Sequence, residues 1–507
     1  MIKVINAYDA AKKISDKATL CLTGCTYRLM PEAILAALEE RFKKEGKPND
    51  LKLIYPIMVE KSRAGHGGAG SGINHLAHNG MLKRVIGGSF SRKADEELNQ
   101  LITSNAVESY NFPMGTIFQW FRTAASGKKG LITDVGLGTY VDPRIEGGKM
   151  NDITREDLSE VVEFKGREYL YYPPLSIDVA LISGTYADEK GNITLEQEAF
   201  SLGVLYLAMA AKNSGGRVIA QVKRVIKKNT IHPKKVVVPG ALVDDIVIYD
   251  NDYEDERDPA ITGEIREIIT TKNFVFNPQT VIARCALNQL KEGQIVNLGA
   301  GIPMYTISGM ARKNDMYRKI NFTIEQGPFG GLPEAGGIAR NPEAFLDSLE
   351  VFDFYEGGGI DTACLSFAQV DSNGNVNVSR FANMMPGGGG FINITHRTKN
   401  IIYCGTLTAN GLNIEFDDKK LKIVSEGKIK KFVSEVDQIT FNGRRAIENG
   451  QNILFVTERA IFKLQKEGIV LIEVAPGIDP DRDILPHIDF KVKISPRCKS
   501  MNIDIFK

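Results

Sequence analysis

Two stretches of the chain repeat one sequence pattern at a constant offset of 183 residues. They are DVALISGTYADEKGN (178–192) and DTACLSFAQVDSNGN (361–375), and the Asp, Ala, Ser, Gly and Asn positions of the pattern recur in both. GRVIAQV (216–222) and KNIIYCG (399–405) lie in register at the same offset. Each copy is typical of a β-strand followed by a turn that Asp and Gly-Asn close. A chain with this repeat is predicted to fold as two related halves.

Apolar, β-branched runs alternate with amphipathic stretches along the whole chain, which is the pattern of an α/β protein. PEAILAALEERFKKEG (31–46) predicts an amphipathic helix, with Pro31 at its start and Gly46 as its C-cap. The expected strands include 51–58, 234–241, 294–301, and the second strand of each repeat, 192–196 and 375–379.

The acidic, polar stretch YDNDYEDERDPA (249–260) is the natural linker between the two halves. We therefore expect an N-terminal domain over 1–255, a linker over 256–271 and a C-terminal domain over 272–507. Both should be open α/β domains, and the cleft between them is the expected place of an active site.

Charge and targeting features exclude several classes of partner. The 63 Lys and Arg residues nearly cancel the 62 Asp and Glu residues, which gives no electrostatic argument for nucleic acid or an anionic membrane. No apolar run approaches the length of about 20 residues that crosses a bilayer. The N-terminal sequence MIKVINAYDAAKKISDKATL is typical of a strand and a helix rather than a signal peptide. A cytoplasmic enzyme is expected.

Neither the cysteines nor the histidines have the spacing of a metal site. The 6 cysteines form no CxxC pair, and the 6 histidines form no HExxH motif. We expect a structural role for the cysteines and no bound metal.

A glycine cluster at 65–70, GHGGAG, matches the GxGxxG pattern of dinucleotide-binding proteins. That fingerprint needs its glycines directly at the end of a strand, and an acidic residue at the end of the next strand. Here KSRA intervenes after the strand, and the next strand, KRVIGGSF, ends on serine and phenylalanine. A nicotinamide cofactor is therefore not expected.

One carboxylate, Glu325, stands in the glycine-rich stretch TIEQGPFGG (323–331), directly after the probable strand NFTI. It could be a buried acid that backbone N–H groups or a salt bridge satisfy. The neighbouring glycines favour a second interpretation, because they leave room for a substrate and expose backbone donors. PGGGGF (386–391) offers a similar donor set for an oxyanion. Both interpretations stay open at this point.

Several motifs in a fixed order make the chain resemble the class I coenzyme A transferases. They include DVGLGTYVDPRIEGGKMN (134–151), GAGIP (299–303), TIEQGPFGG (323–331), FDFYEGGGID (352–361) and PGGGGFINIT (386–395). The resemblance covers essentially the whole chain. It is to the single-chain acetate/propionate CoA-transferases, which are related to the succinyl-CoA:3-ketoacid CoA-transferases.

The resemblance implies a set of site residues. The family's nucleophile, a glutamate that forms a glutamyl-CoA thioester, corresponds to Glu325. Its oxyanion contributors correspond to Gly389 and, in the same run, Gly390 and Gly388. Where many relatives have Pro-Gln-Gly, this chain has Pro113, Met114 and Gly115, and methionine cannot donate a hydrogen bond. Coenzyme A contacts are expected at Gly299, Gly301 and Gly327.

The resemblance also implies the reaction: transfer of coenzyme A between a short-chain acyl-CoA and a free acid such as acetate. No tightly bound cofactor is expected, because the coenzyme A thioester is itself a substrate. Relatives form homodimers or homotetramers, so a homo-oligomer is expected here. Two alternatives stay open, an acyl-CoA thioester hydrolase on the same scaffold and a non-catalytic ligand-binding α/β protein.

Overall fold

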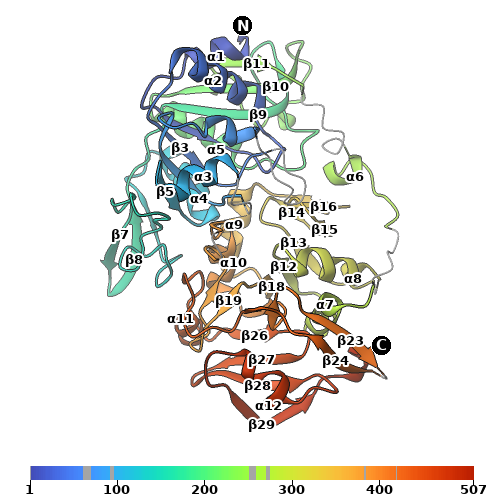
Figure 1. Cartoon of the computed structure of the whole chain (residues 1–507). Helices are drawn as coiled ribbons and strands as arrows, with labels where there is room; N and C mark the ends of the chain where they lie inside the picture. Colours follow the sequence, from blue (N-terminus) through green and yellow to red (C-terminus); the bar gives the residue numbers. More distant parts are fainter. Residues whose placement is uncertain are drawn as a thin grey trace.

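Two large sheets, one in each half of the chain, organise the fold. The structure is a computed structural model, which describes residues 2–60, 70–91, 96–250, 258–269, 275–313, 315–381, 384–417 and 419–506. Figure 1 shows the N-terminal sheet at the top and the C-terminal sheet at the bottom. This is the α/β class with two related open domains that the sequence predicts.

The N-terminal sheet has eight strands, and all of its pairs are parallel. In spatial order they are β1 (Lys3–Ile5), β11 (Asp245–Ile248), β10 (Arg217–Ile226), β9 (Val179–Asp188), β2 (Thr19–Leu22), β3 (Leu51–Tyr55), β4 (Leu82–Gly87) and β5 (Glu108–Asn111). A small separate sheet holds β6 (Leu131–Thr133), β8 (Arg167–Tyr172) and β7 (Glu160–Phe164). The helices of this half are α1 (Ala7–Lys12), α2 (Glu32–Glu45), α3 (Glu97–Thr103), α4 (Met114–Ala125) and α5 (Val204–Asn213).

The C-terminal sheet has ten strands with a parallel centre. In spatial order they are β17 (Ala344–Phe345), β14 (Pro328–Phe329), β13 (Asn321–Thr323), β12 (Ile295–Leu298), β18 (Thr362–Ser366), β21 (Asn400–Cys404), β26 (Asn452–Val456), β27 (Ala460–Gln465), β28 (Gly468–Val474) and β29 (Lys493–Ser500). Four two-stranded sheets accompany it: β15 (Leu332–Glu334) with β16 (Ile338–Arg340), β19 (Gln369–Val370) with β20 (Val376–Asn377), β22 (Thr408–Ala409) with β25 (Ile429–Lys430), and β23 (Asn413–Asp417) with β24 (Lys420–Ser425). The helices are α6 (Pro259–Thr262), α7 (Pro278–Leu287), α8 (Ser308–Lys313), α9 (Ser348–Glu356), α10 (Phe391–Arg397), α11 (Gly443–Glu448) and α12 (Pro480–Asp483).

The repeated sequences form the same structure in both halves. Val179 of β9 pairs with Arg217 of β10, and Thr362 of β18 pairs with Asn400 of β21, so register and offset agree. The turns agree as well. The Asp188 carboxylate accepts hydrogen bonds from the backbone and side chain of Asn192, and Asp371 does the same with the corresponding Asn375. The duplication that the sequence indicates is therefore present in the fold.

The strand pairing also identifies which residue of the N-terminal half corresponds to Glu325. Ile54 of β3 pairs with Cys21 of β2, as Thr323 of β13 pairs with Asn297 of β12. Glu325 stands two residues beyond Thr323, and two residues beyond Ile54 the chain has Pro56. The N-terminal copy thus has no carboxylate at this place.

Most local predictions are confirmed, and two are wrong. The helix predicted over 31–46 is α2, and its C-cap Gly46 has a φ of 66°. The segment 234–241 is not a strand, because Pro239 lacks an N–H for a ladder and only Val238 forms a bridge, to Ile193. The segment 192–196 is not a strand either, since the described bridges within it all involve Ile193.

Two further predictions fall partly on residues that the structure does not describe. The GxGxxG stretch at 65–70 lies outside the described residues except for Gly70. The linker predicted over 256–271 is described only over 258–269, where α6 lies. The domain boundaries stay a prediction. In the described part of the chain, no helix has the length and apolar character needed to cross a membrane.

Helices from both halves meet in the middle of the molecule. α4 contacts α9 and α10, which lie between the two large sheets (Figure 1). Phe118 of α4 stacks on Phe352 of α9 with ring centroids 6.0 Å apart. One hydrophobic cluster contains these rings together with Met114 and Phe200 from the first half and Ile338 from the second. The interface is therefore packed as a core.

Candidate active site

Glu325 lies beyond the carboxyl end of β13, at the edge of the parallel sheet where ligands of α/β proteins bind. Its side chain is half-buried. The turn that carries it is held at both ends, since Gly327 N–H donates to Ile324 O at 3.0 Å and Leu346 N–H donates to Gly327 O at 3.1 Å. Gly327 has a φ of 134°, a conformation that glycine adopts without strain. The tight turn thus fixes the position of the acid.

The carboxylate of Glu325 has very little to neutralise it. Gln326 Nε2 donates to its Oε1 at 3.2 Å, and no other hydrogen bond or ion pair reaches it from the described residues. Burial raises the pKa of Glu325 to about 7, and the bond from Gln326 opposes this rise. The interpretation of Glu325 as a structural acid required backbone donors or a salt bridge, and neither is present in the described structure. An under-solvated carboxylate of this kind is available for chemistry.

The glycine run 387–390 brings backbone against this carboxylate. A Cβ added at Gly390 would lie 1.9 Å from Glu325 Oε2, so any side chain there would displace the carboxylate. Gly388 N–H donates to Asn111 Oδ1 at 2.8 Å, and Gly389 N–H donates to Gly88 O at 2.9 Å. Within the described residues, Gly390 N–H has no protein acceptor. Of the three amides predicted to bind an oxyanion, Gly390 is the one that is free to do so in this structure.

Met114 and Gly115 form the first turn of α4 and reach the same place from the other half. Met114 N–H donates to Gly389 O at 2.9 Å, and its side chain is 3% exposed. Gly115 N–H donates to Asn393 Oδ1 at 3.1 Å. A Cβ on Gly115 would lie 2.6 Å from the Phe352 ring, so this glycine permits the close approach of α4 to α9. The structure thus brings Met114, Gly115 and the glycine run together.

The glycines predicted to contact coenzyme A lie along the same sheet edge. Gly299 and Gly301 follow β12, the neighbour of β13, and Gly327 stands in the turn after Glu325. Gly301 has a φ of 93°, and a Cβ there would lie 2.6 Å from Ser366 Oγ. Their contact with coenzyme A stays a prediction.

Several polar residues around Glu325 were not found by sequence reasoning. Beneath it, Tyr355 OH bonds with Thr323 Oγ1 at 2.9 Å and accepts from Asn297 Nδ2 at 3.3 Å. Cys25 also lies near: burial raises the pKa of its thiol to about 12, and the Glu325 charge adds to this rise while Arg28 opposes it. Arg28 lies in the loop that follows the apolar strand β2, and this position was the only sequence signal for it.

No metal centre accompanies these residues in the part of the chain that the structure describes. There, no group of three or more His, Cys, Asp or Glu side chains is arranged to hold an ion. The cysteines of the chain are unpaired thiols.

Comparison with known proteins gives full-length matches. Acetate CoA-transferase YdiF of Escherichia coli (strain K12) is 40% identical over 515 residues, which cover 100% of this chain and 95% of that protein. Caffeate CoA-transferase of Acetobacterium woodii is 40% identical over 525 residues, with 100% and 98% covered. The solved structure of acyl-CoA transferase YdiF from E. coli O157:H7, in a thioester complex with CoA, has a TM-score of 0.92 at 38% identity and covers 100% of this chain and 96% of that chain.

The family model described as coenzyme A transferase matches residues 4–248, the half with the eight-stranded sheet. The relatives above extend this match through the second half, including Glu325. Their names and this degree of identity identify the protein as a CoA-transferase. The chain belongs to the coenzyme A transferase family.

Proposed function

We propose that the protein transfers coenzyme A from a short-chain acyl-CoA to a free carboxylic acid through a thioester on Glu325. The observation that carries this proposal is the half-buried Glu325 carboxylate, with a pKa of about 7 and no ion pair to a cation of the described residues. A carboxylate with so little solvation is a better nucleophile than one in water. The similarity to an acyl-CoA transferase solved in a thioester complex with CoA supports the same reaction here.

The proposed reaction has two matched halves. The Glu325 carboxylate attacks the acyl-CoA carbonyl, which forms a mixed anhydride and releases the CoA thiolate. The thiolate attacks the glutamyl carbonyl, so that a glutamyl-CoA thioester forms and the donor's acid leaves as a carboxylate. The acceptor acid then reverses both steps. No proton is consumed, and the energy of the first thioester is kept in the second.

The glycine run has a defined part in this proposal. Each tetrahedral intermediate carries an oxyanion, and Gly390 N–H is the donor available to it beside Glu325. Gly388 and Gly389 hold the run in place through their bonds to Asn111 and Gly88. Gly299, Gly301 and Gly327 are proposed to border the coenzyme A itself. The substrates are proposed to be short-chain acids such as acetate, and the enzyme is proposed to act in the cytoplasm as a homodimer or homotetramer.

Mass analysis of the peptide that carries Glu325 tests the mechanism. After incubation with acyl-CoA alone, this peptide should gain the mass of coenzyme A less one water. Borohydride, which reduces thioesters and leaves carboxylates intact, should inactivate the enzyme only after acyl-CoA has been added. Parallel-line kinetics should accompany this dependence.

Two substitutions of Glu325 test separately the need for its negative charge and the need for its side-chain length. Glu325→Gln is nearly isosteric but lacks the anionic nucleophile, so transfer should fall to background. Glu325→Asp keeps the charge but withdraws it by one methylene, which opens a gap for water between carboxylate and thioester. This variant should lose transfer and show slow hydrolysis of acyl-CoA. Near-normal transfer by Glu325→Gln would refute the mechanism, and wild-type turnover without any acceptor acid would identify a hydrolase instead.

A further inference from the structure

One arginine near Glu325 has no anion to neutralise it. Arg28 lies in the loop between β2 and α2, at the carboxyl edge of the N-terminal sheet. Its side chain is buried, with 3% of the residue exposed. No hydrogen bond or ion pair joins its guanidinium to any of the described residues, and its Nε is fully buried without a partner. Burial of an unpaired charge is costly, so such a group calls for a ligand.

The guanidinium of Arg28 stacks on an aromatic ring. The guanidinium carbon lies 4.4 Å from the centroid of Tyr27. Stacking occupies one face of the group but accepts none of its five N–H donors, which point outward in the guanidinium plane. Tyr27 therefore orients Arg28 and leaves its hydrogen-bonding edge available.

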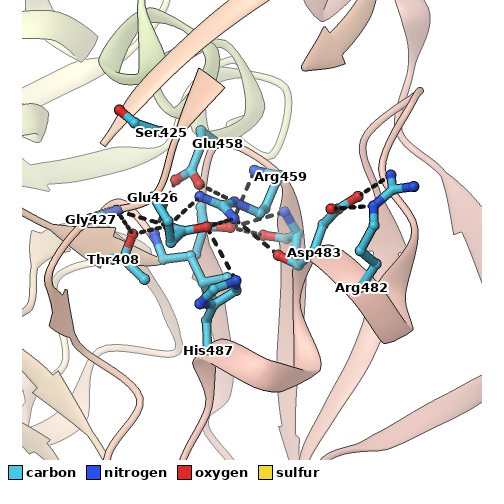
Figure 2. A network of polar contacts seen from close by, with 12 residues as sticks. Thr408, Ser425, Glu426, Gly427, Glu458, Arg459, Arg482, Asp483 and His487 are labelled. Atoms are coloured by element: carbon cyan, nitrogen blue, oxygen red, sulfur yellow. Dashed lines mark hydrogen bonds and ion pairs between the residues drawn. The ribbon is translucent and has the colours of Figure 1, made fainter. Parts of the chain in front are cut away.

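A second buried arginine shows how this fold treats such a residue when its role is structural. Arg459 is fully buried, and it donates to Glu426 at 2.7 and 3.0 Å, to Glu458 at 2.5 Å and to Asp483 O at 2.9 Å (Figure 2). Two carboxylates and a carbonyl thus surround it. Arg28 has none of these partners, although it is nearly as buried.

The loop that carries Arg28 is held in an unusual conformation. Cys25 and Arg28 exchange two backbone hydrogen bonds of 3.0 Å, which close a tight turn. Thr26 lies within this turn and Leu29 follows it, and their φ values are 53° and 51°. Residues other than glycine rarely adopt this left-handed region of the backbone. Backbone strain of this kind is typical of ligand-binding positions.

Contacts through the β15–β16 turn connect Arg28 to the nucleophile. A Cβ on Gly336 would lie 3.2 Å from an Arg28 terminal nitrogen, and a Cβ on Gly337 would lie 2.5 Å from the Gln326 side chain. Gln326 in turn donates to Glu325. Arg28 forms no ion pair with Glu325. Both charges nevertheless act on the pKa of the Cys25 thiol, which Arg28 lowers and Glu325 raises. The guanidinium therefore lies in the neighbourhood of Glu325 without forming an ion pair with its carboxylate.

We infer that Arg28 binds a carboxylate at the far end of the acyl group, so that the preferred substrates are short dicarboxylic acids and their mono-CoA thioesters. This inference rests on the proposed function, because Glu325 fixes where the reacting end of the acyl group lies. The surroundings are apolar: Leu29, Ile57, Met114 and Ile338 belong to the buried cluster that also contains Cys25, whose thiol is influenced by both Arg28 and Glu325. An aliphatic chain with one anion at its tip matches this arrangement, and a guanidinium binds a carboxylate with two parallel hydrogen bonds.

Arg28→Met tests the assignment with acetyl-CoA as donor and glutarate, succinate or butyrate as acceptor. The wild type should use a dicarboxylate with a higher kcat/KM than butyrate. In the variant, kcat/KM for the dicarboxylates should fall roughly 10- to 100-fold, while the value for butyrate should stay within about 3-fold. Wild-type preference for butyrate, or an equal loss with all three acids, would overturn the inference.

Two controls keep the result interpretable. Arg28→Met removes an unpaired buried charge, so its Tm should equal or exceed that of the wild type, whereas Arg459→Met should lower Tm by breaking a satisfied network. A clear fall in Tm for Arg28→Met would show that the residue is structural and would overturn the inference. Acetyl-CoA alone should still label Glu325 in Arg28→Met. Absence of this label from the wild type as well would refute the proposed function rather than the role of Arg28.

Discussion

At the scale of the residue, Glu325 couples activity to stability. Burial raises its pKa to about 7, from an ordinary value near 4.5. Between these two pH values the folded chain holds a proton that the unfolded chain has lost. The stability of the fold therefore decreases as the pH rises from about 4.5 to about 7, and the loss above pH 7 is about 1–3 kcal/mol. Keeping Glu325 ionised as a nucleophile therefore lowers the free energy of unfolding above pH 7.

Glu325→Gln should accordingly stabilise the protein in a pH-dependent way. At pH 8 the variant should unfold at a Tm about 1–3 °C above that of the wild type, and at pH 4.5 the two Tm values should agree. In the wild type, kcat/KM for transfer should rise with pH up to about 7 and then level off, because the ionised acid is the nucleophile. Thermal scans and rates across this range are the measurement. A Tm difference that is independent of pH would contradict the assigned pKa.

At the scale of the element, the start of α10 must approach the turn after β13 without any side chain between them. Gly390→Ala would introduce a methyl group 1.9 Å from Glu325 Oε2, which forces the carboxylate out of position. Transfer should fall roughly 100-fold or more, since small displacements of reacting groups are that costly. Both kcat/KM and the yield of labelled Glu325 should report this loss.

Gly357→Ala is a matched control, because Gly357 ends α9 with a φ of −69° and the nearest atom to its added Cβ would lie 3.2 Å away. It should transfer coenzyme A at nearly the wild-type rate. Equal activity of the two alanine variants would show that the contact between Gly390 and Glu325 does not matter for the reaction.

The elements also show what the sequence can and cannot predict. The strand β12 and the helix α2 have periodic apolar residues and clear ends, and both form as expected. The segment 234–241 has the same apolar character, but Pro239 and the lack of a partner strand leave it irregular. Glu325 could be found because the glycines beside it are local. The surroundings of Arg28 could not, because they include a turn at Gly336, more than 300 residues away in the chain.

At the scale of the whole molecule, the two halves hold each other through backbone and side-chain contacts across the site. Tyr140 N–H donates to Ile439 O at 2.8 Å. Gly203 is the residue before α5, and its N–H donates to Asp347 Oδ2 at 2.8 Å. Ser201 Oγ donates to the same atom at 2.6 Å. Together with the mixed hydrophobic cluster, these contacts predict association without a covalent link.

Residues 1–255 and 256–507 produced as two chains in one cell should therefore copurify in equal amounts and transfer coenzyme A. Their unfolding midpoint should rise with protein concentration, because the loss of the linker turns an intramolecular contact into an association. Gel filtration and thermal scans at several concentrations are the measurement. Two halves that elute separately would show that the linker, rather than the interface, holds the molecule together.

Pro56, at the position that corresponds to Glu325, has a consequence for how this enzyme can change over evolutionary time. Of the two copies, only the C-terminal one has an acid at this position. The N-terminal copy carries Arg28 and three of the four apolar residues named with it above, Leu29, Ile57 and Met114. Mutations there can alter which acid is accepted without touching the copy that performs the chemistry. In the proposals above, the repeated fold thus places the anion-binding side chain in one copy and the reactive acid in the other, within a single chain.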